Sequence, residues 1–240
     1  MKAIPSYKIF PLRLGTITRD NSNMMYMRDN GKKIDCPLIA WLVTDGKINI
    51  LVDTGGTAPD GKRYLPYERS SGEDLESQLC LHGVKPSDVS IVIMTHLHWD
   101  HAGNNLLFPQ ARFFVQKKEL QYAVCPLKIQ ESAYDYDLIF KTKYIGIEGD
   151  NCLLPGISVI NTPGHSPGSQ SIIVNTKDGD YIIVGDLIGL YACYEADPMI
   201  VNGLHTNLFE YYDSLNRVKA SNAKILPGHD PKVFEKKVYG

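Results

Sequence analysis

The chain has 240 residues, of which 43% are hydrophobic and 22% charged, as is usual for a soluble globular protein, and we expect a single α/β domain over residues 1–240. A formal net charge of −2 gives no electrostatic reason to expect a nucleic-acid partner, and no apolar run approaches the roughly eighteen residues of a membrane span. The five cysteines are widely spaced and the N-terminus lacks the apolar stretch of a secretory signal, so we expect free thiols in the cytoplasm.

The first half of the chain is predicted to alternate strands and helices. Three apolar, largely β-branched runs predict strands, at residues 38–43, 48–52 and 89–94. The first two lie on either side of the turn-like pair Asp45-Gly46, which predicts a hairpin. Residues 57–71 contain glycines, prolines and paired serines and are predicted to form a loop. Residues 73–81 have helical spacing and stop before Gly83, which suits a helix C-terminus.

The second half continues the alternation. Five further strands are predicted, at residues 112–115, 157–161, 171–175, 181–184 and 223–226. Helices are predicted over residues 117–124 and over residues 208–220, the second with one apolar face. Residues 125–150 have weak periodicity and receive no assignment. Two strand-rich halves that each carry helices predict two sheets packed together and covered by helices on the outside.

Histidine and aspartate side chains follow several of these strands directly. The strand at 89–94 leads into Thr95-His-Leu-His-Trp-Asp-His, and similar tight turns after later strands supply two more histidines and an aspartate. The resulting candidate metal ligands are His96, His98, Asp100, His101, His165, Asp186 and His229. Imidazole and carboxylate groups are the ligands that Zn²⁺ prefers, and this set is large enough for two divalent ions. Zn²⁺ is the expected metal, although Mn²⁺, Fe²⁺ or Co²⁺ would also be accepted.

These stretches resemble the metallo-β-lactamase superfamily and, within it, the N-acyl-homoserine lactone lactonases. The resemblance is carried by residues 50–55, 95–105, 162–171 and 227–230, and it extends over nearly the whole chain. It implies an α/β fold of the αββα type, a four-layer sandwich in which two mixed β-sheets are flanked by helices.

The resemblance also implies a role for each candidate ligand. The first ion would be bound by the imidazoles of His96, His98 and His165. The second ion would be bound by Asp100, His101 and His229, and the carboxylate of Asp186 would bridge both ions. Asp53 would hold a ligand imidazole by a hydrogen bond. A hydroxide bridging the ions would open a small lactone such as an N-acyl-homoserine lactone, and we expect Asp100 to protonate the leaving alkoxide.

The chain departs from the lactonase pattern at one position. The lactonases usually carry a tyrosine three residues after the bridging aspartate, where its hydroxyl meets the substrate, and here that residue is Gly189. Tyr191 or Tyr194 would take the catalytic role if the loop bulges, and otherwise the role is absent. In the lactonases the corresponding segments line the acyl pocket, and soft, apolar side chains suit an alkyl tail, so the resemblance implies substrate contacts at Met25, Tyr26, Tyr64 and Tyr67. The same side chains could instead pack on a sheet edge or on a dimer partner.

Other functions fit the same ligand set. A thioesterase like glyoxalase II, or a phosphodiester or carboxylester hydrolase, would use a similar site, whereas a redox role would need a flavin domain for which the chain has no signal. A binding module stabilised by metal is the non-enzymatic alternative. We expect a small-molecule lactone or ester as the partner, no nucleic acid or membrane, and either a monomer or a homodimer.

Overall fold

The computed structural model describes residues 4–57 and 66–240. Its strands are β1 (Lys8–Asp20), β2 (Lys33–Thr44), β3 (Asn49–Val52), β4 (Tyr67–Glu68), β5 (Val89–Ile93), β6 (Arg112–Gln116), β7 (Tyr144–Ile147), β8 (Asn151–Leu154), β9 (Ile157–Asn161), β10 (Gln170–Thr176), β11 (Gly179–Ile183) and β12 (Lys224–Leu226). The α-helices are α1 (Asn21–Met24), α2 (Leu75–Cys80), α3 (Trp99–Ala102), α4 (Lys117–Ala123), α5 (Tyr136–Lys141), α6 (Tyr191–Glu195) and α7 (Leu208–Ala220).

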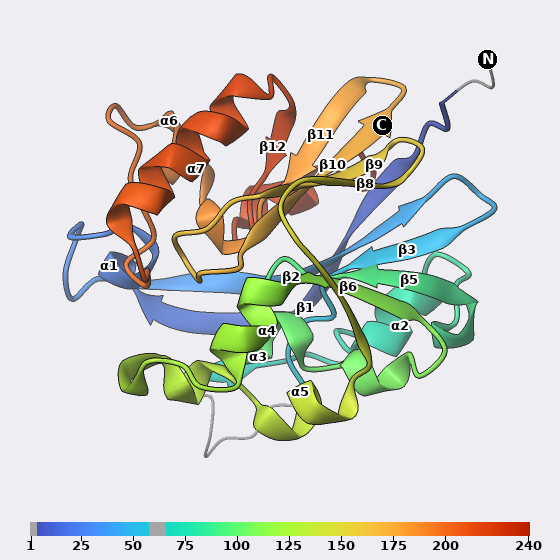
Figure 1. Cartoon of the computed structure of the whole chain (residues 1–240), viewed down its shortest axis with the longest axis horizontal. Helices are drawn as coiled ribbons and strands as arrows, with labels where there is room; N and C mark the ends of the chain where they lie inside the picture. Colours follow the sequence, from blue (N-terminus) through green and yellow to red (C-terminus); the bar gives the residue numbers. More distant parts are fainter. Residues whose placement is uncertain (1–3, 58–65) are drawn as a thin grey trace.

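These strands form two sheets that lie face to face, with helices on both outer faces (Figure 1). The first sheet has the strand order β4-β1-β2-β3-β5-β6-β7, and the second has the order β12-β11-β10-β9-β8. Both sheets are mixed, since β3, β5, β6 and β7 run parallel in the first, and β11 and β12 run parallel in the second, while their other pairs are antiparallel. The predicted αββα sandwich is therefore confirmed.

Burial on both faces of the central strands explains their apolar sequences. In β2, Ile39, Trp41 and Val43 belong to the core between the two sheets. Leu38, Ala40 and Leu42 point the other way and belong to the core between the first sheet and its helices. Alternate side chains of a strand point to opposite faces, so a strand covered on both sides is apolar throughout. A third core lies between the second sheet and α7.

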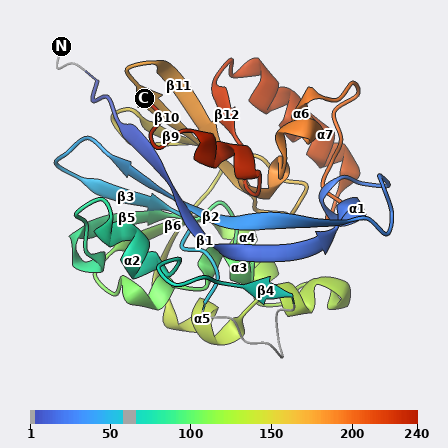
Figure 2. The ribbon, with the colours of Figure 1, turned by 180° about the vertical axis from the view of Figure 1, so that it is seen from behind.

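The predicted hairpin is confirmed, because β2 and β3 pair antiparallel, and the helix predicted over residues 208–220 matches α7. The longest strand, β1, was not predicted. Its alternation is interrupted where the pairing with β2 shifts register between Arg13 and Thr16, and Gly15 within that shift has a φ of 105°. Figure 2 shows β1 and β2 side by side, extending along the first sheet toward α1. The unassigned residues 125–150 contain α5 and β7.

None of the helices in residues 4–57 and 66–240 is long and apolar enough to cross a membrane.

Candidate metal centre

The segments that follow four strands bring the candidate ligands to one edge of the sandwich. β5 leads to His96 and His98, and the short helix α3 directly afterwards carries Asp100 and His101. The turn between β9 and β10 carries His165. Asp186 lies in a 3-10 turn after β11, Gly185–Leu187, and His229 follows β12. Each candidate ligand is thus positioned by a strand that ends a few residues before it.

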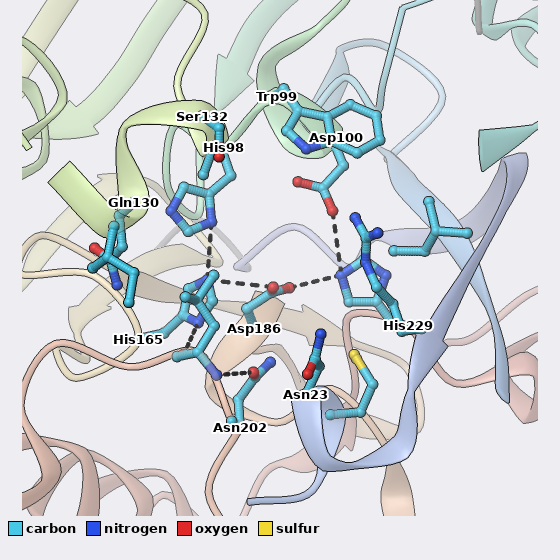
Figure 3. Close-up of a pocket in the computed structure, with 17 residues that line it drawn as sticks. Asn23, His98, Trp99, Asp100, Gln130, Ser132, His165, Asp186, Asn202 and His229 are labelled. Carbon is cyan, nitrogen blue, oxygen red and sulfur yellow. Dashed lines mark hydrogen bonds and ion pairs between the residues drawn. The ribbon is translucent and has the colours of Figure 1, made fainter. Parts of the chain in front are cut away.

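The seven side chains form two groups, and within each group the possible ligand atoms lie within 4.8 Å of one another. One group contains His96, His98, His165 and Asp186, and the other contains Asp100, His101 and His229. Asp186 lies between the groups (Figure 3). Its Oδ2 is 3.3 Å from His165 Nε2, and its Oδ1 is 3.1 Å from His101 Nε2 and 2.9 Å from His229 Nε2. This is the position that the resemblance implied for a bridging carboxylate.

Hydrogen bonds on the outer side of the site fix the imidazole rings. His165 Nδ1 lies 2.7 Å from the Leu204 carbonyl oxygen, and His229 Nδ1 lies 2.9 Å from the Pro37 carbonyl oxygen. A carbonyl oxygen can only accept, so both Nδ1 atoms carry the proton. The Nε2 lone pairs are then available on the inner side of the site, which is the arrangement that metal ligands need.

The inner side of the site contains polar atoms that are buried without partners. The Nε2 atoms of His96, His98 and His101 have no hydrogen-bond partner among the residues that the structure describes. More than nine in ten buried polar groups in folded proteins are normally paired, so three such atoms in one place require an explanation. Nitrogen donors beside two carboxylates suit divalent cations, and these residues therefore fit a pair of metal ions.

Electrostatics divides the histidines into two kinds. Burial, together with the neighbouring imidazoles, lowers the pKa of His96 and of His98 well below the usual range, so both rings are neutral at pH 7. Burial alone would also lower the pKa values of His101 and His229, but the Asp186 and Asp100 carboxylates raise both. Asp186 remains ionised, because the imidazoles of His229, His101 and His165 outweigh its burial and lower its pKa.

We expect metal binding to the apoprotein at pH 6.5 to release protons from His101 and His229. Because both pKa values are raised above 6.5, each ring is more than half protonated at this pH, and a metal must displace that proton. Titration calorimetry with Zn²⁺ in buffers of different ionisation enthalpy measures this release directly. A binding enthalpy that is the same in all buffers would contradict the prediction. The same raised pKa values stabilise the apoprotein below pH 6.5, and this stabilisation is lost as the pH rises through the higher folded-state pKa.

Asp53, directly after β3, connects its loop to the segment that carries His96 and His101. Its Oδ2 lies 2.7 Å from His101 Nδ1 and accepts a hydrogen bond of 2.7 Å from the Thr95 hydroxyl, while its Oδ1 accepts one of 2.7 Å from the Thr95 backbone N–H. The Thr95 hydroxyl is also 3.0 Å from His96 Nδ1. The geometry places Asp53 against a candidate ligand imidazole, where the resemblance implied it.

Replacing Asp53 by asparagine is expected to lower the metal affinity of the His101 group by about 10–100-fold. Whichever way the new amide turns, its N–H groups face either His101 Nδ1 or the Thr95 N–H, both of which donate. The backbone is not the cause, because Asp53 has a φ of 60° and asparagine tolerates this conformation as aspartate does. Competition with a chromophoric chelator measures the affinity, and unchanged binding of both ions would refute the prediction.

Glu119, on α4, is a buried carboxylate that joins the two loops of the first group. Its Oε1 accepts hydrogen bonds from the Leu97 N–H at 3.0 Å and the Tyr134 hydroxyl at 3.2 Å. Its Oε2 accepts from the Ser166 hydroxyl at 2.5 Å and the Gly168 N–H at 3.3 Å. Burial raises the pKa of Glu119 despite these donors. Leu97 lies between His96 and His98, and Ser166 follows His165, so Glu119 fixes the spacing of all three imidazoles.

The Glu119→Gln variant is expected to lose about 1–3 kcal/mol of stability, because an amide N–H would face a donor that it cannot pair with. Denaturant unfolding of the metal-free protein measures the loss without interference from metal binding. As a control, Glu148→Gln removes a surface carboxylate that pairs with Lys117 on the same helix, and its stability should change little. Equal stability of Glu119→Gln and wild type would contradict this account.

The predicted tyrosines are not brought to the centre. The Tyr191 hydroxyl donates to the Ile225 carbonyl oxygen at 3.3 Å, on the side of the second sheet where its ring lines a separate depression with Tyr239. Tyr194 packs against the core between the second sheet and α7. Neither residue is among those that line the cavity containing the candidate ligands, so the catalytic roles expected of these two tyrosines stay predictions that this geometry does not support.

That cavity has a volume of about 410 Å³, and its walls include Ile17, Met24, Trp99, Gln130, Ser132 and Asn202. The predicted substrate contacts are mostly elsewhere. The Tyr67 hydroxyl donates to the Leu14 carbonyl oxygen and its ring contacts Trp99, so it is part of the core. Met25 packs against the core between the second sheet and α7, and Tyr26 lies against the ring of His205. Tyr64 lies outside the described residues.

Comparison with known proteins agrees with this geometry. The profile of the metallo-beta-lactamase superfamily matches residues 37–229. An N-acyl homoserine lactonase of Bacillus sp is 30% identical over 193 residues, covering 75% of each chain, and the N-acyl homoserine lactonase AttM of Azorhizobium caulinodans is 28% identical over 255 residues, covering 93% of each. The solved structure of an N-acyl homoserine lactone hydrolase, with the product N-hexanoyl-L-homoserine at its catalytic metal centre, has a TM-score of 0.83 at 25% identity and covers 95% of both chains.

The match spans both halves of the sandwich and every loop that carries a candidate ligand. The chain therefore belongs to the metallo-beta-lactamase superfamily, where its relatives are N-acyl homoserine lactonases, and it is a metal-dependent hydrolase of ester bonds.

Proposed function

We propose that this enzyme opens the ring of a small lactone of the N-acyl-homoserine lactone class. The observation that supports the proposal best is the pair of ligand groups joined by Asp186 at the cavity wall, with unpartnered imidazole nitrogens on the inner side. A cavity of about 410 Å³ suits a small molecule better than a polymer. The lactonases among the relatives support the choice of a lactone.

Two divalent ions are proposed, one held by His96, His98 and His165, and the other by Asp100, His101 and His229. Asp186 would contact both. When bound, such ions polarise an ester carbonyl and lower the pKa of a coordinated water toward about 7, which supplies a nucleophile at neutral pH. We propose Zn²⁺ because nitrogen ligands predominate.

The protein itself supplies orientation and proton transfer. Asp100 lines the cavity, and its Oδ2 is 3.8 Å from His229 Nε2, so it faces both the candidate ligands and the substrate space. We propose that Asp100 carries the proton that the departing ring oxygen needs as the C–O bond breaks. The balanced reaction consumes one water and yields a hydroxy acid, whose carboxyl group releases a proton at neutral pH.

The proposal is tested with lactones, thioesters and phosphodiesters, assayed with enzyme reconstituted with Zn²⁺ or Mn²⁺. Acid release followed with a pH indicator should give the highest kcat/KM for a lactone. Asp100→Asn should be slower on the same lactone while retaining metal. Preference for a thioester or phosphodiester would replace the proposed substrate class, and no turnover by a fully metallated sample would favour the binding module.

A further inference from the structure

Asn202 presents a buried amide to the cavity of the metal centre. It lies in the loop between α6 and α7 and lines the cavity, but only 3% of the residue is exposed. Its Oδ1 accepts a hydrogen bond of 2.9 Å from the Leu204 backbone N–H. Because a backbone N–H can only donate, this bond fixes which end of the amide is oxygen. Figure 3 shows the other end, Nδ2, on the side of Asp186 opposite His98 and Asp100.

The hydrogen bonds of Asn202 to described residues involve its backbone and its Oδ1, and none within residues 4–57 and 66–240 involves Nδ2, which is open to the cavity. A side chain that is buried except where it faces a cavity, and whose donor has no protein partner there, is a candidate for substrate contact. No such donor is provided by Tyr191, whose hydroxyl is already paired with Ile225.

The Asn202 backbone is anchored to the metal centre on both sides. Its N–H donates to the Tyr211 hydroxyl at 3.2 Å, and that hydroxyl lies 2.8 Å from the Asp186 carbonyl oxygen. The Leu204 carbonyl oxygen, two residues later, lies against His165 Nδ1. The amide is therefore held in a fixed relation to two candidate ligands, which is the preorganisation that transition-state stabilisation requires.

The amide also stands next to Gly189. A Cβ atom built at Gly189 would lie 2.8 Å from Met24 Cε and 3.8 Å from Asn202 Nδ2. A larger side chain at position 189 would have to displace Met24 and would come close to the Asn202 amide. The loop from α6 to α7 therefore supplies a donor beside a position that has no side chain of its own.

We propose that Asn202 is a catalytic residue whose Nδ2–H donates to the carbonyl oxygen of the substrate ester as negative charge develops there. The inference rests on the proposed ester hydrolysis but not on the identity of the acyl group. A preorganised donor of this kind typically accounts for about 10²–10³-fold in kcat. Because the charge exists only in the transition state, the interaction raises kcat more than it lowers KM.

The test uses the metallated enzyme and two variants whose side effects differ. Asn202→Ala removes the amide together with the acceptor of the Leu204 N–H, whereas Asn202→Asp retains that acceptor but replaces the donor by an oxygen. Both should lower kcat by about 100-fold with little change in KM. Metal content should stay at the wild-type value. Asn175→Asp is the matched control, because the Asn175 amide donates to the Pro5 carbonyl oxygen, remote from the cavity, and this variant should retain full activity.

A thiolactone with the same acyl chain identifies which substrate oxygen is contacted. If Asn202 donates to the carbonyl oxygen, both variants should lose the same factor on lactone and thiolactone. A loss confined to the lactone would overturn the assignment and indicate the ring oxygen instead. Wild-type kcat in either variant would refute the role of Asn202 while leaving the proposed lactone hydrolysis intact, and failure of the wild-type enzyme on every lactone would refute the substrate class alone.

Discussion

Removal of the divalent ions is expected to abolish hydrolysis and to lower Tm by about 8–16 °C for each site that was occupied. A ligand present at about 1,000 times its Kd stabilises the folded state by about 4.1 kcal/mol. For a chain of this size, 1 kcal/mol corresponds to about 2–4 °C in Tm. The folded state should bind the ions far better than the unfolded chain, since its ligands come from four separate segments that only folding brings together. Calorimetric scans before and after chelation measure the shift.

Re-addition of Zn²⁺ is the control for this experiment, because it should restore both Tm and activity. The three unpartnered Nε2 atoms and the paired outer Nδ1 atoms indicate that the ligands are positioned before the metal arrives. The secondary structure should therefore survive chelation, and circular dichroism below the transition should be unchanged. A chelated sample with the Tm of the metallated enzyme would show that the site contributes nothing to stability.

The sequence could predict most strands, the hairpin and the edge on which the ligands lie, because each depends on residues that are close together in the chain. Each candidate ligand follows an apolar run directly, as His96 follows β5 and Asp186 follows β11. An apolar run marks a buried strand, and the strand end determines the edge to which the next side chains belong. The assignment of each ligand to one ion came from the resemblance and remains a prediction.

Glu119 and Asn202 could not be predicted, because their roles depend on tertiary contacts. A glutamate in the first turn of a helix ordinarily faces solvent and favours the helix dipole, so nothing near Glu119 in the sequence indicates that it is buried. Asn202 lies in a polar loop, and only the packing of Tyr211 and Leu204 around it fixes its amide. No short stretch of the sequence contains the information about these tertiary contacts.

Helix α6, which was not predicted, determines where the two tyrosines lie. It begins at Tyr191, which packs against the core between the two sheets and donates to the Ile225 carbonyl oxygen, while Tyr194 packs against the core between the second sheet and α7. A bulged loop would have left them free to reach the cavity. The short helix, whose N-terminal backbone N–H at Tyr191 donates to Asp230, prevents this.

Replacement of Asp186 by alanine is expected to lower kcat/KM by a factor on the order of 10⁴, about 5.4 kcal/mol of transition-state stabilisation. Asp186 is the carboxylate among the candidate ligands that contacts imidazoles of both groups, since it lies between 2.9 and 3.3 Å from His165, His101 and His229, whereas Asp100 contacts only His101 and His229. Its loss removes a negative charge that would offset two divalent cations, so the ions would repel one another more strongly. Elemental analysis together with steady-state kinetics measures both consequences.

Metal content is therefore expected to fall from two ions toward one in Asp186→Ala. The matched control is Asp230→Asn, because Asp230 is also buried but accepts hydrogen bonds from the Lys232 and Tyr191 backbone N–H groups instead of facing the imidazoles. That variant should lose stability and keep both ions. If Asp186→Ala retained two ions and wild-type kcat/KM, the carboxylate would not link the two groups, and the two halves of the centre would have to be regarded as independent metal sites.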